Sequence, residues 1–329
     1  MKLVDPVDRG TLSKVGDDLL VSESGHEYPI IQGVPILLVR NAVQTHGAAT
    51  ATVNLDKTDP LFLETIGITP DERAALKQFA PNSPIDPVVQ FLIAHTNGRL
   101  YRGLVGKLHD YPIPHLRLPS GEGRTFLDIG SNWGRWSIAA ARKGYKVTAI
   151  DPSLGAALAG RRVAKQLGLD IEFVVGDARF PPFENASFDA CFSYGVLQHF
   201  SRDNAGLAIA EIGRVLSPGS SSLVQMPNKF GLVCIAHQAL RGFSDGKDFS
   251  VRYWRPKDLM RLFASAIGRS RLSVDGFFGL GIQYSDMHRM PPIYAAAIRL
   301  SEYLRKASEK FTPMVMLADS IYVHSVKHQ

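Results

Sequence analysis

Two carboxylates and two glycines at fixed spacing give this chain its clearest chemical pattern. The run Phe126-Leu-Asp-Ile-Gly-Ser-Asn-Trp-Gly134 places an acid two residues before one glycine, and a second glycine follows four residues later. The apolar run Lys146–Asp151 ends in another acid. Strand, glycine turn, helix and second strand begin a nucleotide-binding βαβ unit. A dinucleotide fingerprint starting at Gly130 needs glycines where this chain has Asn132 and Arg135, so the spacing argues against a dinucleotide.

The same residues resemble motif I of the class I S-adenosylmethionine (SAM)-dependent methyltransferases. SAM has no pyrophosphate for a helix N-terminus. It carries an ammonium, which a carboxylate such as Asp128 attracts, and a ribose diol, which Asp151 can bind through two acceptor oxygens. The resemblance implies that the cofactor lies along both strand ends and touches Asp128, Gly130, Ser131, Asn132, Gly134, Asp151, Pro152 and Ser153. The alternative is a loop that needs glycine for its backbone and binds nothing.

Further motifs follow in the order that this family has. Ile171–Ala178 is a third apolar strand, and the resemblance implies that Asp177 and Ala178 reach the adenine. Pro181–Phe200 resembles the family's loop and fourth strand. Glu211–Gly219 resembles its helix end, where Pro and Gly are expected to stop the helix. A fifth strand is expected over Ser222–Pro227, so the resemblance extends over roughly residues 124–228.

The resemblance implies an α/β fold, a Rossmann-like seven-stranded sheet in the order 3-2-1-4-5-7-6 with helices on both faces. We expect this SAM-dependent methyltransferase domain over residues 121–329, with residues 229–292 as an acceptor-site insertion or helical lid. Four later elements are expected: an inserted helix within Lys229–Lys247, a strand over Leu272–Phe278, an amphipathic helix over Ile293–Lys310 and a last strand over Ser320–Val326.

The N-terminal residues 1–42 are expected to form a small β-rich module. Leu19–Val39 alternates apolar runs with glycine turns. Tyr28-Pro-Ile and Gly33-Val-Pro-Ile-Leu-Leu resemble the second half of the Trm112-like zinc module. Val21 and Ser24 stand where that module has its second cysteine pair. A tetrahedral zinc site needs four thiolate or imidazole ligands, so we predict a module without zinc.

Residues 43–120 are expected to be a linker followed by a helical cap. Residues 43–54 are small and polar, and Thr69-Pro70 predicts a helix start, since proline suits the first helical position. A short helix is predicted for Gly98–Leu104. In the resembled family this approach segment covers SAM, so Tyr101 and Arg102 are candidates for contacting it. The alternative is a solvated helix with one packed aromatic side chain.

The composition and charge of the chain restrict the kinds of partner that it is expected to bind. The net charge of +6 is mild for 329 residues, and no run of five basic residues occurs, so nucleic acid is not expected as a partner. Cys191 and Cys234 lie in apolar runs and predict buried thiols rather than a disulfide framework. No stretch of about 18 apolar residues predicts a membrane span, and the N-terminus has no apolar signal core. A cytoplasmic protein is the default expectation.

Methyl transfer from a sulfonium is an in-line displacement, and an alcohol acceptor also needs a base. His199 follows the predicted fourth strand and is the candidate catalytic base. The alternative role for His199 is structural. His237 and His288, in the predicted lid, are weaker candidates for the base. Tyr194 and Trp133 are candidates for cation–π contact with the sulfonium, and plain packing is the alternative.

The residues directly after the predicted fourth strand indicate the class of acceptor. Enzymes that methylate planar nitrogens carry an Asn/Asp-Pro-Pro run there, whereas this chain has Ser193-Tyr-Gly-Val. We therefore predict O-methylation of a hydroxyl on a small molecule, a sugar or glycolipid, or a secondary metabolite. Two alternatives stay open: a quinone or lipid C-methyltransferase, and a partner-dependent SAM-binding module acting on a macromolecule. A homodimer is also left open.

Overall fold

The structure is a computed structural model, and it describes residues 2–45, 47, 50, 52 and 83–329. The chain forms two compact units, Met1–Ser187 and Phe188–Gln329, and each is described by itself. The division falls inside the predicted methyltransferase domain. The boundaries predicted at residues 42 and 120, and those of the insertion, stay predictions.

The first unit is built on seven strands in the order β1-β2-β3-β4-β7-β6-β5. The strands β1 to β4 pair antiparallel with one another, whereas β7, β6 and β5 are parallel. The order β7-β6-β5 is the predicted 3-2-1 order. The strand bounds are β1 Leu12–Val15, β2 Leu19–Ser22, β3 Glu27–Ile31, β4 Val34–Leu37, β5 Thr125–Ile129, β6 Lys146–Asp151 and β7 Ile171–Gly176.

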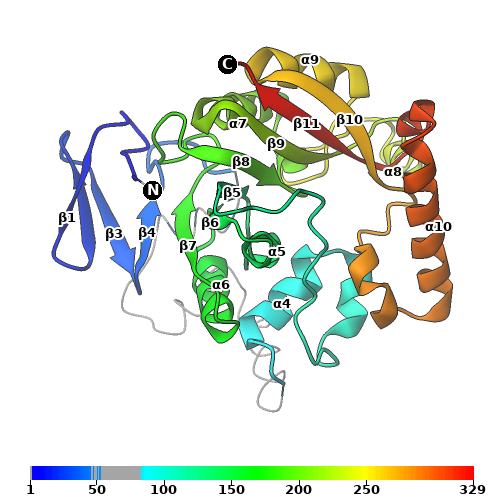
Figure 1. The fold of residues 1–329 in the computed structure, drawn as a ribbon, viewed down its shortest axis with the longest axis horizontal. Helices are drawn as coiled ribbons and strands as arrows, with labels where there is room; N and C mark the ends of the chain where they lie inside the picture. The colour runs from blue at the N-terminus through cyan, green and yellow to red at the C-terminus, as the bar shows by residue number, and fades with distance from the viewer. Residues whose placement is uncertain (1, 46, 48–49, 51, 53–82) are drawn as a thin grey trace. The chain divides into compact units, whose positions relative to one another are not determined.

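The N-terminal hairpins extend the sheet of the first unit (Figure 1). Strand β4 pairs parallel with β7, with Ile36 opposite Val175. Val34, Ile36 and Leu37 are buried, so this edge packs as core. Gly33 lies in the left-handed region, and a Cβ there would collide with the guanidinium of Arg161. The β-rich segment predicted for residues 1–42 is therefore present, and hydrogen bonds join it directly to the motif-bearing strands.

Two helices of the first unit, α4 and α6, begin at side-chain caps. The Asp86 carboxylate accepts hydrogen bonds from the backbone N–H groups of Val88 and Val89, and Ser153 caps the helix that begins at Leu154 in the same way. The predicted helix start at Thr69-Pro70 lies outside the described residues. The short helix predicted before the core is present as a 3₁₀-helix. The bounds are α4 Pro87–Thr96, η1 Arg99–Leu104, α5 Arg135–Arg142 and α6 Leu154–Gln166.

The second unit contains four strands in the order β8-β9-β11-β10, which is the predicted 4-5-7-6 order. Strands β8 and β9 are parallel, while β11 runs antiparallel to both of its neighbours. Their bounds are β8 Phe188–Ser193, β9 Leu216–Pro227, β10 Gly268–Gly276 and β11 Ser320–Lys327. The α/β, Rossmann-like fold class is thus confirmed, with N-terminal hairpins and helices added to it.

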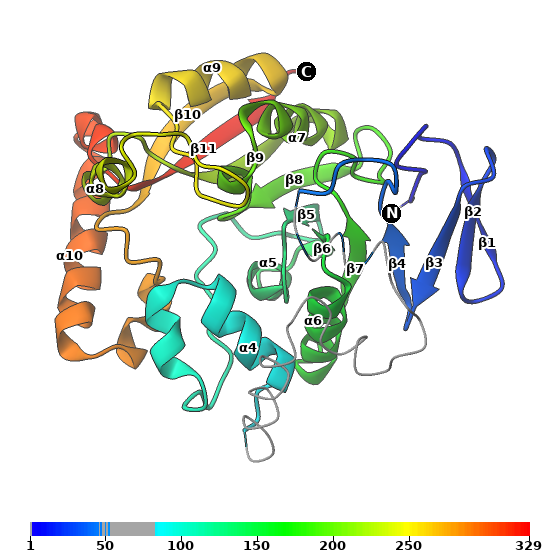
Figure 2. The ribbon, with the colours of Figure 1, turned by 180° about the vertical axis from the view of Figure 1, so that it is seen from behind.

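Helices cover the strands of the second unit. The helices α9 and α10 pack on β10, and α7 packs on β9; Figure 2 shows α7, α8 and α9 from behind. The predicted helix stop at Pro218-Gly219 is wrong, because α7 ends at Val215 and the chain enters β9 at Leu216. The bounds are η2 Leu197–His199, α7 Arg202–Val215, α8 Leu232–Leu240, α9 Pro256–Ala266, η3 Tyr284–Arg289, α10 Pro292–Ser308 and η4 Thr312–Met316.

Both cysteines are buried free thiols, as predicted. Burial raises the pKa of each thiol above its usual range, so neither is a reactive thiolate. Among the described residues, none of the helices combines the length and the apolar character that crossing a bilayer requires.

Candidate active site

The loop between β5 and α5 is held in a tight turn by its backbone. The N–H groups of Gly130 and Ser131 both donate to the carbonyl of Ile150 at the end of β6, at 2.8 and 3.1 Å. Gly130, Asn132 and Gly134 have positive φ values of 71°, 51° and 82°. Glycine and asparagine tolerate this region best, which explains why the motif places them here.

Asp151 is fixed at the carboxyl end of β6 by the loops on either side. Its Oδ2 accepts the backbone N–H of Asn132 at 2.8 Å, and its Oδ1 accepts that of Ser153 at 2.9 Å. The next carbonyl, of Pro152, accepts a hydrogen bond from the buried Thr52 hydroxyl at 3.2 Å. The motif residues predicted around Asp151 therefore converge, and Thr52 joins them from the segment predicted as a linker.

Asp128 is almost fully buried on the adjacent strand, and the Ser137 hydroxyl donates to its Oδ2 at 2.6 Å. Burial, with a further contribution from the charge of Asp151, raises the pKa of Asp128 to about 7, although the Ser137 bond opposes the shift. The charge of Asp151 beside the buried carboxyl of Asp128 makes this site electronegative. A phosphate would be repelled there, whereas a cation would relieve the repulsion.

The residues present fit SAM on two further observations. The Ser131 hydroxyl and the Trp133 indole N–H are buried, and neither has a hydrogen-bond partner in the described part of the chain. Buried polar groups are normally paired, so these two groups are candidates for hydrogen bonds to a ligand. The carboxylate oxygens of Asp128 and Asp151 are hydrogen-bond acceptors, which suits the ammonium and the diol of SAM as donors. Ser131, Asn132 and Gly134 lie in one loop, as the motif predicts.

The third predicted carboxylate, that of Asp177, is already paired with an arginine. Asp177 follows β7 and forms a buried ion pair with Arg179, whose Nη2 lies 2.6 Å from Oδ2. The Arg179 Nε lies 3.1 Å from each carboxylate oxygen. Arg179 also donates to the carbonyl of Val43 at 2.7 Å, so it ties the strand end to the N-terminal segment. Ala178 lies between the paired residues, and its contact with adenine stays a prediction.

The two candidates in η1 differ in their environments. Tyr101 is fully buried, and the Arg135 guanidinium lies over its ring at 5.1 Å and donates to its hydroxyl at 3.1 Å. Arg102 is exposed and its Nε lies 3.3 Å from the Ala94 carbonyl at the end of α4. Tyr101 therefore contacts the first turn of α5, which directly follows motif I, whereas Arg102 faces α4. Trp133 is fully buried against Tyr111, with ring centroids 5.8 Å apart.

Tyr194, in the second unit, belongs to a polar network at the carboxyl edge of β8 and β9. Its hydroxyl donates to the Asp275 carboxylate at 2.8 Å and accepts from the Gln283 amide at 2.7 Å. Ser320 donates to the same Asp275 oxygen at 2.7 Å. Asp275 lies where the register of β10 shifts against β11. Such an irregularity redirects a side chain, and no local pattern in the sequence predicts it.

His199 is half-buried and lies at the end of η2. Its Nδ1 lies 2.7 Å from the carbonyl of Phe249, and the two rings stack with centroids 4.1 Å apart. A carbonyl only accepts, so Nδ1 carries the proton and Nε2 is the acceptor of the neutral ring. Nε2 faces the Gln198 amide nitrogen at 3.2 Å. Arg252 donates to the His199 carbonyl at 2.7 Å and clamps the same segment.

The other histidine candidates are less constrained. His237 is exposed on α8, and its Nδ1 lies 3.4 Å from the Tyr253 hydroxyl. His288 is exposed in η3.

Asp319 fixes the start of α8 and the chain after β10. One of its carboxylate oxygens accepts the N–H groups of Val233 and Cys234, and the other accepts that of Phe278.

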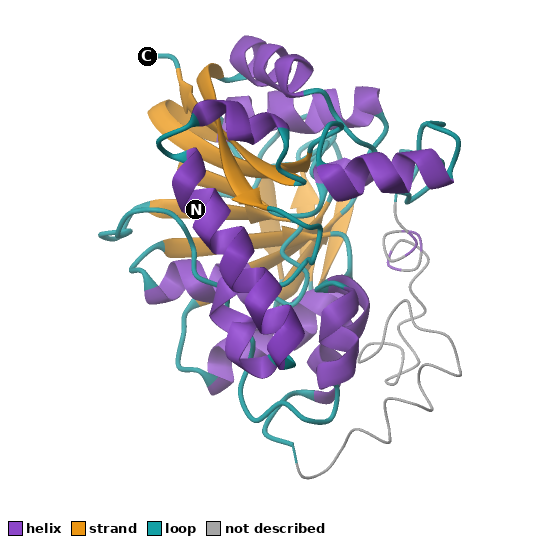
Figure 3. Ribbon diagram, turned by 90° about the vertical axis from the view of Figure 1, so that its right-hand side faces the viewer, coloured by secondary structure: helices purple, strands orange, loops and turns teal. Residues whose placement is uncertain are grey.

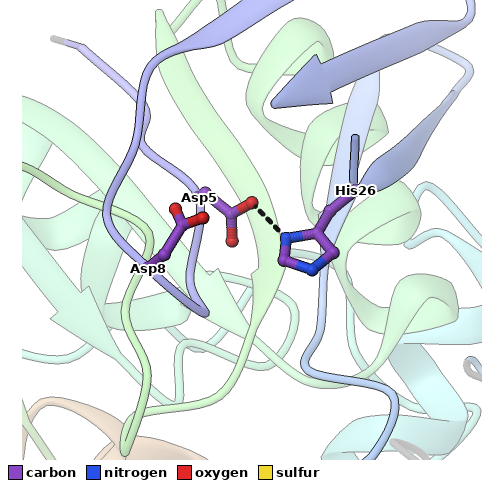
Figure 4. A group of neighbouring side chains, drawn as sticks. All are labelled: Asp5, Asp8 and His26. Atoms are coloured by element: carbon purple, nitrogen blue, oxygen red, sulfur yellow. Dashed lines mark hydrogen bonds and ion pairs between the residues drawn. The ribbon is translucent and has the colours of Figure 1, made fainter. Parts of the chain in front are cut away.

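The N-terminal segment contains one group with metal-ligand geometry in the described part of the chain, formed by Asp5, Asp8 and His26 (Figure 4). Their ligand atoms lie within 4.8 Å of one another. His26 Nδ1 lies 2.7 Å from Asp5 Oδ2, while Tyr28 and the backbone of Val7 donate to Oδ1 at 2.9 and 2.7 Å. Burial opposes ionisation of Asp5, but these hydrogen bonds hold its pKa below the usual range. Neighbouring groups of the protein thus already form hydrogen bonds with the carboxylate of Asp5. The absence of zinc from this segment stays a prediction.

Comparison with known proteins bears on the motif region. The family profile described as a methyltransferase domain matches residues 126–219. A ubiquinone biosynthesis O-methyltransferase of Methylocella silvestris is 30% identical over 150 residues, which are 44% of this chain and 58% of that protein. A demethylmenaquinone methyltransferase of Renibacterium salmoninarum is 37% identical over 103 residues, or 31% of this chain and 40% of that protein. The chain thus covers less than two thirds of either relative.

Among solved structures, a SAM-dependent methyltransferase of Methanosarcina mazei is similar to 65% of this chain. The match covers 95% of that protein, at 20% identity and a TM-score of 0.45.

Proposed function

We propose that this chain, whose residues 126–219 match a methyltransferase-domain profile, is a class I SAM-dependent methyltransferase that transfers the methyl group of SAM to a hydroxyl on a small molecule. The observation that carries the cofactor half of this proposal is the pair Asp128 and Asp151 on adjacent parallel strands. Burial and mutual repulsion raise the pKa of Asp128, and a bound ammonium would offset both effects. SAM supplies the electrophilic methyl group when it is bound.

Oxygen is the proposed acceptor atom because of His199. The Phe249 carbonyl holds the proton on Nδ1, which leaves Nε2 as the basic nitrogen. A base oriented by a third group is the arrangement that general-base catalysis requires. Gln198 lies against Nε2 and would have to give way to the acceptor hydroxyl. The names of two similar proteins, a ubiquinone biosynthesis O-methyltransferase and a malonyl-[acyl-carrier protein] O-methyltransferase, support O-methylation.

The network around Tyr194 is the proposed acceptor-binding part of the second unit. It offers a carboxylate, a phenol and an amide that converge from β10, β8 and the loop before η3. In open α/β sheets, ligands bind at the carboxyl ends of the parallel strands, and this network lies at that edge of β8 and β9. A small polar acceptor, including a sugar, suits such a lining.

The experiment uses SAM with a ¹³C-labelled methyl group, the purified chain, and either a soluble catechol or a glycan-containing extract as the acceptor. A labelled methoxy resonance in the product supports O-methylation. A labelled carbon-bound methyl group instead supports the second candidate, a quinone C-methyltransferase, which the similarity to a demethylmenaquinone methyltransferase favours. SAM binding without any labelled product, in both preparations, would favour a partner-dependent SAM-binding module.

A further inference from the structure

Exposed apolar side chains are concentrated in the second unit. Of the eighteen large apolar side chains that are exposed in the described residues, fifteen belong to residues 188–329. Most of them lie on three segments, residues 230–243 around α8, helix α10, and residues 311–317 around η4. Contiguous exposed apolar area of this kind marks an interaction surface.

These three segments adjoin one another within the second unit. The Asn228 amide, just before α8, donates to the carbonyls of Val315, Met316 and Ala318. The segment after η4 therefore lies against the start of α8, and η4 itself packs on α10. In Figure 3, where the right-hand side of Figure 1 faces the viewer, α10 lies in front of the strands of its own unit.

Helix α10 has two distinct outer stripes. Ile293, Leu300 and Tyr303 are exposed at a spacing that places them on one side of the helix. Arg299 and Lys306 are also exposed, and their spacing places them along the adjoining side, while Lys310 is exposed just after the helix ends at Ser308. Both acidic residues near the end of this helix, Glu302 and Glu309, are already paired with Arg305 at 2.7 Å. An apolar stripe with a basic border is typical of helices that lie in a membrane interface.

Charge identifies the occupant of this surface. Residues 188–329 contain 17 Lys and Arg against 11 Asp and Glu, a net charge of +6, whereas residues 1–187 contain 20 of each. The whole excess charge of the chain thus lies in the unit with the exposed apolar residues. A second copy would set one basic border against another, which is repulsive. An anionic surface is complementary, and each basic residue near it adds to the attraction.

We propose that the face formed by residues 230–243, α10 and residues 311–317 docks peripherally on an anionic lipid bilayer. Side chains such as Leu240, which is 86% exposed, and Phe243 enter the headgroup region. The border of Arg299, Lys306 and Lys310 contacts the lipid phosphates. A bilayer accepts such side chains from separate convex helices, because it adapts to their shape. Docking requires neither SAM nor an acceptor.

Flotation of the full chain with lipid vesicles tests this proposal. We expect binding to vesicles in which about a third of the lipid is phosphatidylglycerol, weak binding to pure phosphatidylcholine, and release at high salt. Leu300→Glu should lower vesicle binding about tenfold, since it places a charge in the apolar stripe. Arg299→Gln, Lys306→Gln and Lys310→Gln should each lower it about fivefold.

Leu207→Glu on α7 is the matched control, because Leu207 and Leu300 are 51% and 50% exposed in the same unit. It should bind vesicles like the parent. SAM affinity of Leu300→Glu should be unchanged, which separates a docking defect from failure of the proposed function. Parent protein that ignores both kinds of vesicle would overturn the proposal. Equal losses of vesicle binding in Leu300→Glu and Leu207→Glu would also overturn it. So would a dimer of the parent protein that Leu300→Glu dissociates, if neither protein binds vesicles.

Discussion

The Ser137 hydroxyl lies 2.6 Å from Oδ2 of Asp128 and donates a hydrogen bond to that buried carboxylate. The bond joins the first turn of α5 to β5, the two elements on either side of the glycine loop. It opposes the rise in the pKa of Asp128 without cancelling it. The pKa of Asp128 therefore stays raised, and a bound cation would favour the ionised form of this motif-I acid.

Asp128→Asn should stabilise the protein without SAM and weaken SAM binding. The folded pKa of about 7 exceeds the ordinary value of 3.8, so the parent loses stability as the pH rises from about 4 through 7. The asparagine variant escapes this loss, and its advantage above pH 7 should approach about 4 kcal/mol. Denaturant melts at pH 5 and pH 8 measure it, and calorimetry should show SAM affinity at least tenfold lower. Equal SAM affinity in both proteins would exclude Asp128 from the site.

Asp151→Ala should weaken SAM binding by about 1–3 kcal/mol, because the ribose hydroxyls would lose a buried acceptor pair. The variant also leaves the N–H groups of Asn132 and Ser153 without their acceptor, so a small loss of stability is expected. Isothermal calorimetry measures the affinity. Asp170→Ala, an exposed acid just before β7, is the control and should bind SAM normally. Unchanged affinity in Asp151→Ala would refute the ribose assignment.

His199→Ala should lower turnover by about 100-fold or more while SAM affinity changes little, which is the usual scale for a lost general base. Turnover of the parent should rise with pH, because only the neutral imidazole accepts a proton at Nε2. Initial rates at saturating SAM across the pH range measure both effects. His115→Ala, at an exposed position in the first unit, serves as the control. If turnover of His199→Ala matches the parent, His199 is not the base, and His237, His288 or an acidic phenol acceptor becomes the alternative.

Asp5→Ala should destabilise the protein by about 2–4 kcal/mol, because a buried carboxylate that accepts several hydrogen bonds is removed. Its pKa lies below the usual range, so its contribution is present above about pH 4 and is lost as the pH falls through that lowered pKa. Asp17→Ala, an exposed acid in the same segment, should change stability little. Thermal melts measure the difference.

The same N-terminal segment is predicted to hold no zinc, and elemental analysis of the purified chain checks this. Stoichiometric zinc that His26→Ala removes would show that the Asp5, Asp8 and His26 group is a metal site after all. SAM affinity should not change in Asp5→Ala, since the predicted SAM residues lie beyond residue 100. A folded Asp5→Ala variant that no longer binds SAM would contradict that separation.

The sequence by itself determined the motif loop and the strands on either side of it, whereas the strand order was expected only from the family resemblance. Gly130, Asn132 and Gly134 are needed because the turn requires positive φ, a local demand that residue type satisfies. The apolar runs ending in Asp151 and Gly176 are strands of the length that a buried parallel sheet requires. Patterns of this kind are complete within a short stretch of chain, and therefore they can be predicted without the fold.

Only the tertiary structure decided which distant groups meet. Strand β4 joins the sheet beside β7, more than a hundred residues away in sequence, because both edges bury apolar side chains. The Asp177–Arg179 pair is close in sequence, yet Arg179 also donates a hydrogen bond to the carbonyl of Val43, more than a hundred residues away. The Phe249 carbonyl selects the tautomer of His199 across fifty residues. Such contacts depend on how elements pack, and side-chain periodicity along one element carries no information about its partner.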